Sequence, residues 1–301
     1  MNHNKILIVS HDAGGAEVVS SWVRCHPEYQ FEFCLDGPAV GIFQKKIIKL
    51  ENQPVVHLEK IIQKSNRVVT GTSWASDIEK EAIKLGKKLG KTVASFLDHW
   101  VNYPQRFQYN GQTCLPDEIW VGDEDALRIA QNYFPKEKLK FVPNPYFQDI
   151  KDELNSLRLP PRQTKKVRIL YVCEPIGEHS RREYGHSLHW GYTEYDALRF
   201  FFKKLADMIS FENIESVCVR NHPSESRDKY DTILEEYPAI PFKKSGGNSI
   251  IDDCVWADWV AGCNSMALVV GLLAGKKVYS CIPPGGHLCS LPQKGIIHLR
   301  T

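Results

Sequence analysis

The sequence predicts an α/β fold made of two Rossmann-like, doubly wound domains. Short apolar runs alternate with amphipathic segments of helical length in both halves of the chain. A polar, proline-rich stretch without periodicity, Leu159 to Lys166, separates the two series and is typical of an interdomain linker. We therefore expect an N-terminal domain over residues 1–155 and a C-terminal domain over 156–301.

In the first half, strands are expected where short apolar runs end in small or polar residues. They cover residues 5–10, 31–35, 55–58, 67–70, 92–97 and 118–122. Helices are expected after the first strand and over about 77–89 and 123–133, where apolar residues recur at helical spacing. The interspersed Glu and Lys residues of 77–89 read as an ordinary solvated face.

The second half repeats this alternation. Its predicted strands cover residues 167–172, 214–219, 240–243, 259–261 and 277–282. Helices are expected over 193–209, 225–236, 249–256 and the apolar run that ends at Gly275, while 178–192 reads as a charged, aromatic loop. Alternation in both halves indicates two parallel sheets, each covered on both faces.

Composition narrows the class of protein. The 301 residues suffice for two domain cores, and 43% hydrophobic with 25% charged residues is typical of a globular protein. A net charge of +2 gives no reason to expect a nucleic-acid partner. The nine cysteines form no C-x-x-C pair and no zinc spacing, so we expect neither disulfides nor a metal, and no cofactor.

Targeting signals are not evident in the sequence. The N-terminal apolar run is too short for a signal peptide, and no apolar stretch reaches the length of a membrane span. We therefore expect a cytoplasmic protein, with which a peripheral membrane contact remains compatible.

The first predicted strand ends in a motif suited to ligand binding. His11 and Asp12 follow it, and Gly14 and Gly15 let backbone approach a ligand or the neighbouring strand closely. The pattern is not G-x-G-x-x-G, which argues against a classical dinucleotide site. Either His11 or Asp12 suits a general base. The alternative is that Asp12 caps the helix and His11 bonds a loop.

The loop after the strand 92–97 combines acidic, basic and aromatic residues. Asp98 and His99 are further candidates for a base. His99, Tyr103 and Arg106 are predicted to contact a polar, hydroxyl-bearing acceptor. The alternative is that the aromatic residues of this loop pack it onto the domain.

Two motifs in the second half suit an anionic ligand. The stretch Gly262, Asn264, Ser265 and Met266 lies between a strand and a helix, where free N–H groups attract phosphate. Many α/β folds carry such turns for packing alone. Arg220, His222 and Pro223 follow the strand 214–219. Their side chains could therefore lie at the same end of the sheet as this turn.

Together these motifs resemble those of GT-B glycosyltransferases. Arg220-Asn221-His222-Pro223 looks like the HP motif, and Cys263-Asn264-Ser265 like the serine motif, of bacterial sialyltransferases and capsule Kdo transferases. The resemblance implies two Rossmann-like domains that face a central cleft, with Gly14, Gly15 and the two C-terminal motifs at the donor. Non-hydrolysing UDP-N-acetylglucosamine 2-epimerases share this fold, but paired glutamates follow their turn. Here Met266 to Val269 counts against an epimerase.

From this resemblance we expect a metal-independent glycosyltransferase in surface polysaccharide biosynthesis. Its partners would be a nucleotide-sugar donor and a glycan or lipid-linked acceptor, which Asp12, His11 or Asp98 would deprotonate. One alternative is an epimerase or hydrolase that acts on the nucleotide sugar alone. Another is a sugar-nucleotide-binding protein without catalysis.

Overall fold

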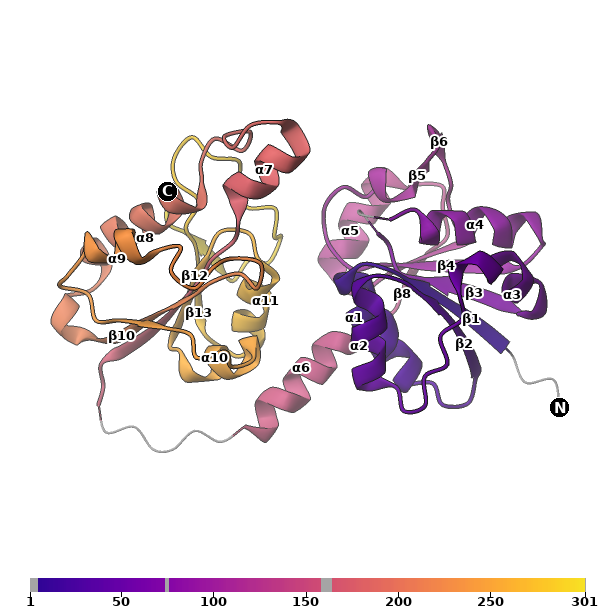
Figure 1. Cartoon of the computed structure of the whole chain (residues 1–301), viewed down its shortest axis with the longest axis horizontal. Coiled ribbons are helices and arrows are strands. Elements are labelled where there is room, and N and C mark those ends of the chain that lie inside the picture. Colours follow the sequence, from indigo (N-terminus) through magenta and orange to yellow (C-terminus); the bar gives the residue numbers. More distant parts are fainter. Residues whose placement is uncertain (1–4, 74–75, 158–163, 301) are drawn as a thin grey trace. The chain divides into compact units, whose positions relative to one another are not determined.

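The structure, a computed structural model, describes residues 5–73, 76–157 and 164–300. The chain divides into two compact units, Met1–Asp149 and Ile150–Thr301 (Figure 1). Each unit contains a six-stranded sheet whose strands all run parallel. The predicted fold class, two Rossmann-like α/β domains, is confirmed.

The sheet of the first unit has the order β2-β1-β3-β4-β7-β8. Its strands are β1 (Lys5–Ser10), β2 (Gln30–Leu35), β3 (Arg67–Thr70), β4 (Thr92–Leu97), β7 (Glu118–Val121) and β8 (Leu139–Phe141). A small hairpin joins β5 (Gln108–Tyr109) and β6 (Gln112–Thr113). The helices are α1 (Ala13–Arg24), α2 (Pro38–Lys46), α3 (Leu58–Lys64), α4 (Ile78–Lys88), α5 (Glu124–Tyr133) and the short η1 (Val55–His57) and η2 (Gln105–Phe107).

Helices cover both faces of this sheet. Ile6 and Ile8 of β1 belong to a core cluster with Val19 and Trp22 of α1. On the other face, Gly86 of α4 lies so close to the side chain of Val93 that any larger residue would collide with it. Strand side chains alternate between the two faces, so every residue of β1 after Lys5 is buried.

The sheet of the second unit has the order β11-β10-β9-β12-β13-β14. Its strands are β9 (Val167–Val172), β10 (Ile214–Arg220), β11 (Phe242–Lys244), β12 (Trp259–Gly262), β13 (Lys277–Ser280) and β14 (Ile296–His298). The helices are α6 (Pro145–Ser156), which begins in the first unit, α7 (Ile176–Tyr184), α8 (Glu194–Met208), η3 (Phe211–Asn213), α9 (Asp231–Glu235), α10 (Ile250–Trp256) and α11 (Met266–Leu273). Phe201 and Phe202 of α8 pack on Ile169 and Tyr171 of β9.

Several local predictions were wrong. Residues 55–58 form η1 and the start of α3, because Pro54 precedes them and Val56 is exposed without a partner strand. The predicted loop 178–192 begins as helix α7, which ends at Gly185 in the left-handed conformation. Gly14 and Gly15 lie in the first turn of α1 and do not form a loop. Strands β8 and β14 and helices α2 and α6 were not predicted, and α9 begins at Asp231, six residues after the predicted start at 225.

Strand order reverses once in each sheet, and this point is where open α/β sheets bind ligands. In the first unit the reversal lies between β1 and β3, and in the second between β9 and β12. The residues that follow these strands are therefore the ones to inspect for function.

Candidate functional site

His11 and Asp12 form a contact at the end of β1. His11 Nδ1 lies 2.7 Å from Asp12 Oδ1, and both side chains are partly buried. Asp12 occupies the N-cap position of α1, but its side chain makes no capping hydrogen bond there. An imidazole held by a carboxylate is a common arrangement for proton transfer.

Glu79, a residue that the sequence analysis did not single out, supports this pair from α4. Its Oε1 accepts a hydrogen bond of 2.8 Å from the backbone N–H of His11. Its side chain is almost fully buried, and Oε2 has no hydrogen-bond partner among the described residues. Burial raises the pKa of Glu79 from 4.5 to about 7. A group with this pKa can take up and release a proton near neutral pH.

The burial of Glu79 could have been predicted from the sequence, although the alternating charges of its helix suggested an exposed face. It shares the buried face of α4 with Ala82, Ile83 and Gly86, at the i, i+3, i+4, i+7 spacing of a core-facing stripe. The interpretation of this helix as an ordinary solvated face is therefore wrong at this position.

Asp98, at the end of β4, lies beside the first turn of α1. Its Oδ1 accepts hydrogen bonds from Arg106 Nη1 at 2.6 Å and from Thr72 Oγ1 at 2.9 Å. Its Oδ2 lies where a Cβ on Gly14 would be, so only glycine fits at that position. Gly15 lies close to the backbone of both Gly71 and Thr72, so both glycines face atoms of their own unit, and their predicted approach to a ligand stays a prediction.

The residues predicted to contact an acceptor have structural partners. Arg106 is buried and bonds Asp98, Thr72 and the carbonyl of Val101. Tyr103 is fully buried and packs on Phe134. Both side chains are packed within the unit, as in the packing alternative, and their contact with an acceptor stays a prediction.

His99, the third of these residues, is partly buried next to Trp100. Burial lowers the pKa of its imidazole, and Nδ1 has no hydrogen-bond partner among the described residues.

In the second unit, the motif after β10 is held by internal bonds. Arg220 Nη1 pairs with Asp253 Oδ2 at 2.6 Å, so its charge is largely used within the unit. His222 Nδ1 lies 2.7 Å from Ser224 Oγ, and burial lowers the pKa of the imidazole. Pro223 lies between His222 and Ser224 in the chain.

An ion cluster in which Lys229, Glu194 and Glu225 are buried and Glu178 is exposed fixes the same loop. Lys229 Nζ lies 2.7 Å from Glu194, 2.8 Å from Glu178 and 2.9 Å from Glu225. Glu225 also accepts a hydrogen bond from the backbone N–H of His222. The cluster thus ties α7 and α8 to the loop that carries His222. It joins residues up to 51 positions apart, which no local pattern reveals.

The turn between β12 and α11 is bonded within the unit as well. Ser265 caps α11, because its Oγ accepts a hydrogen bond from Ala267 N at 3.1 Å. Asn264 Oδ1 accepts from Ser290 N at 2.9 Å. Glu174 Oε1 accepts from Cys263 N at 2.9 Å and from Asn264 N at 2.8 Å. Gly262 passes close to the carbonyl of Val172, and Met266 begins the helix.

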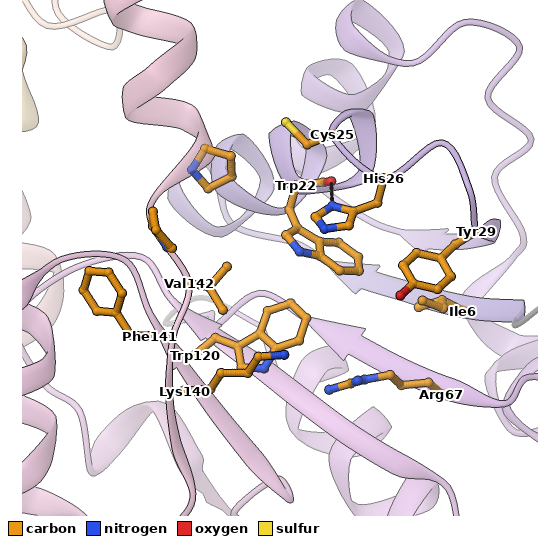
Figure 2. Close-up of a pocket in the computed structure, with 12 residues that line it drawn as sticks. Ile6, Trp22, Cys25, His26, Tyr29, Arg67, Trp120, Lys140, Phe141 and Val142 are labelled. Atoms are coloured by element: carbon orange, nitrogen blue, oxygen red, sulfur yellow. Dashed lines mark hydrogen bonds between the residues drawn. The ribbon is translucent and has the colours of Figure 1, made fainter.

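A cavity of about 470 Å³ lies elsewhere in the first unit (Figure 2). The indoles of Trp22 and Trp120 face it, and Arg67 and Lys140 lie over the Trp120 ring at 5.2 Å from its centroid. Glu118 pairs with Arg67. Ile6 and Arg67 stand at the starts of their strands, so this cavity is not formed by the predicted site residues.

Two further searches gave negative results. Among the described residues, no group of three or more His, Cys, Asp or Glu side chains is placed to hold a metal ion. In the same part of the chain, no helix has the length and apolar character needed to cross a membrane.

Two Rossmann-like domains in one chain define a GT-B-like fold, and solved structures confirm this class. A putative UDP-N-acetylglucosamine 2-epimerase from Listeria monocytogenes matches with a TM-score of 0.63 at 12% identity, over 92% of this chain and 79% of that one. The UDP-GlcNAc 2-epimerase of Methanocaldococcus jannaschii matches with 0.60 at 11%, over 92% and 83%. That of Neisseria meningitidis, bound to UDP-GlcNAc, matches with 0.58 at 10%, over 94% and 83%. No protein-family model and no curated protein sequence matches the chain.

These likenesses correct the main functional prediction. We expected a glycosyltransferase, but the structures that match with these scores are mostly epimerases of nucleotide sugars. The resemblance to sialyltransferases and Kdo transferases finds no support in them. What they establish for this chain is the fold.

Proposed function

We propose that this chain is an enzyme that binds a nucleotide sugar and alters the sugar itself, as an epimerase does. The fold likeness to UDP-N-acetylglucosamine 2-epimerases over more than nine-tenths of the chain supports the substrate class. The observation that carries the proposal is the group of proton-transfer side chains at the switch point of the first unit: His11, Asp12 and Glu79.

Epimerisation by proton transfer removes a proton from a ring carbon while the electron pair left behind expels the neighbouring UDP, and then returns a proton to the opposite face as UDP adds back. Glu79, whose pKa is about 7, can hold or release a proton at neutral pH, and the contact between His11 and Asp12 supplies a second proton-transfer group beside it. Helix α11 carries no acidic residue in its first turn, unlike the paired glutamates expected of such epimerases. The proposal therefore assigns proton transfer to the first unit.

Incubation with UDP-GlcNAc in D2O, followed by proton and phosphorus NMR, tests this function. We expect an epimeric UDP-sugar that carries deuterium at the inverted carbon. Accumulation of free UDP and free sugar would instead identify a hydrolase. Binding without any change in the sugar would contradict an enzyme altogether.

A matched pair of variants tests the assigned residues. Asp12→Asn should lower turnover by about 100-fold or more, with little change in affinity for UDP-GlcNAc, because it removes the partner of His11. Glu28→Gln removes one exposed carboxylate from the same unit and should leave turnover unchanged. Equal activity in both variants would exclude Asp12 from the site.

A further inference from the structure

The cavity of the first unit is separate from the residues of the proposed function. None of His11, Asp12 and Glu79 lines it. It lies between the C-terminal end of α1, residues of β1, β3, β7 and β8, and the segment 141–145, which leads from β8 into α6 (Figure 2). Its volume of about 470 Å³ is within the range of small-molecule sites, about 300–1,000 Å³. The cavity is therefore large enough for a ligand of its own.

Aromatic rings form one side of the cavity. Trp22 and Trp120 contact each other, with their ring centroids 5.1 Å apart. Trp22 also lies 4.4 Å from the His26 ring and stacks on Tyr29 at 6.4 Å. Because His26 and Tyr29 are only half-buried, a ligand in the cavity can reach their rings. A flat aromatic ring is the partner that such a wall favours.

The permanently charged side chains among the described residues that line the cavity are both cations, Arg67 and Lys140. Figure 2 shows both side chains extending toward the Trp120 indole, and each lies 5.2 Å from the centroid of that ring. An indole face attracts a cation without neutralising it. The positive charge therefore remains at the cavity.

The neighbouring carboxylate balances only part of this charge. Glu118 is not a lining residue, and it pairs with both Arg67 and Lys138. One negative charge is thus shared by two cations, while Lys140 forms no ion pair with any described residue. The buried Nε of Arg67 also has no hydrogen-bond partner in the described part of the chain. An acidic group on a ligand would balance the remaining charge.

We propose that this cavity binds a small aromatic anion, which is a flat ring that carries a carboxylate or a phosphate. The ring would pack against Trp22, His26 and Tyr29, and the acidic group would lie at Arg67 and Lys140. The proposal goes beyond the proposed function and does not depend on it, because the two sites share no residue.

Calorimetric titration of the whole chain with four probes separates the ring from the charge. The probes are 2-naphthoate, 2-naphthyl phosphate, the neutral 2-naphthamide and acetate. One of the two aromatic acids should bind at least about tenfold more tightly than 2-naphthamide, because only the acids pair with Arg67 and Lys140. The tighter acid identifies the acidic group, and acetate, which lacks the ring, should not bind detectably. Equal affinity for the acids and the amide, or no binding of either acid, would overturn the proposal.

Lys140→Gln tests the position of the acidic group. It removes an exposed cation of the cavity, so the protein should fold as wild type does and bind the acid at least about fivefold more weakly, with no change for 2-naphthamide. Lys88→Gln is the matched control, because Lys88 is an exposed cation of α4 that does not line the cavity. An unchanged affinity for the acid in Lys140→Gln would contradict the site.

Cys25 reports the position of the ring without any substitution, because its exposed thiol lines the cavity. At about ten times its dissociation constant, the bound acid should slow the reaction of Cys25 with a maleimide by about threefold or more. The same concentration of acetate should leave the rate unchanged. Labelling that is as fast with the bound acid as without it would place the ligand outside the cavity and refute the proposal.

Discussion

A carboxylate lies beside the switch-point helix in both units, but the two carboxylates differ in what balances their charge. Asp98 lies against Gly14 in the first turn of α1 and is paired with the buried guanidinium of Arg106. Glu174 lies before α11 and is bonded by backbone amides. Asp98 forms an ion pair within its unit, whereas Glu174 accepts hydrogen bonds from neutral backbone amides.

The two carboxylates should therefore respond differently when their charge is removed. Removing a charge from a buried ion pair leaves its partner uncompensated, which costs several kcal/mol. Removing a charge that amides alone hold leaves neutral donors, which a neutral oxygen can satisfy. Changes at Asp98 should therefore lower the stability of the protein more than changes at Glu174.

The largest effect on stability is expected for Asp98→Asn. The free energy of unfolding should fall by about 3–5 kcal/mol, because the buried Arg106 loses its counter-charge. Urea denaturation measures this change. Asp125→Asn breaks an exposed pair with Arg128 and should cost less than about 1 kcal/mol. Similar losses in both variants would show that Asp98 is not a built-in charge.

Glu79→Gln tests whether Glu79, in the first unit, is a buried carboxylate that lacks a cationic partner among the described residues. Below pH 4.5 Glu79 is protonated in both the folded and the unfolded state, so its raised pKa costs nothing there. As pH rises to about 7, the unfolded state ionises first and the folded state loses stability.

The glutamine variant has no such penalty. Its stability gain over wild type should therefore grow between pH 4.5 and 7 and level off above, at about 3 kcal/mol. Thermal unfolding across this pH range measures it. A difference that stays flat with pH would show that Glu79 has an ordinary pKa.

Gly14→Ala tests the fit of Asp98 against α1. The added Cβ would overlap Asp98 Oδ2, so we expect a loss of about 1–3 kcal/mol in unfolding free energy. Gly41→Ala in α2 is the control, because a Cβ there meets open space and should stabilise the helix by about 0.5–1 kcal/mol. Opposite signs in the two variants support the contact, and equal signs contradict it.

Glu174→Gln should have the smallest effect on stability. The amide oxygen of glutamine can accept the same N–H bonds from Cys263 and Asn264, so the unfolding free energy should change by less than about 1 kcal/mol. Chemical denaturation beside Asp98→Asn gives the direct comparison. A loss as large as that at Asp98 would remove the distinction between the two carboxylates.

The fold followed from the sequence because it depends on local patterns. Alternating apolar runs and amphipathic segments predicted the alternation of strands and helices in both units, and β1, β4 and β10 to within a residue. Errors arose where one residue overrode the pattern, as Pro54 does before Val55 and Val56.

The candidate site was predicted only in part, because its members meet through distant contacts. His11 and Asp12 are adjacent in the chain, so a contact between them can be predicted from the sequence. Glu79 bonds His11 across 68 positions, and Glu174 bonds Cys263 across 89. The sequence predicted N–H groups for a phosphate at the second turn, which stays a prediction, and it could not show that Glu174 accepts hydrogen bonds from two of these groups.

The distribution of the nine cysteines makes the protein convenient for site-selective chemistry. Only Cys25, at the end of α1, is exposed, whereas Cys114 and Cys289 are half-buried and the other six are buried. Burial raises the pKa of thiols such as Cys34 and Cys254, which keeps them in the unreactive protonated form. A maleimide fluorophore should therefore enter the first unit mainly at Cys25. Paired with a second dye on an engineered cysteine in the other unit, it would report how the distance between the units responds to nucleotide.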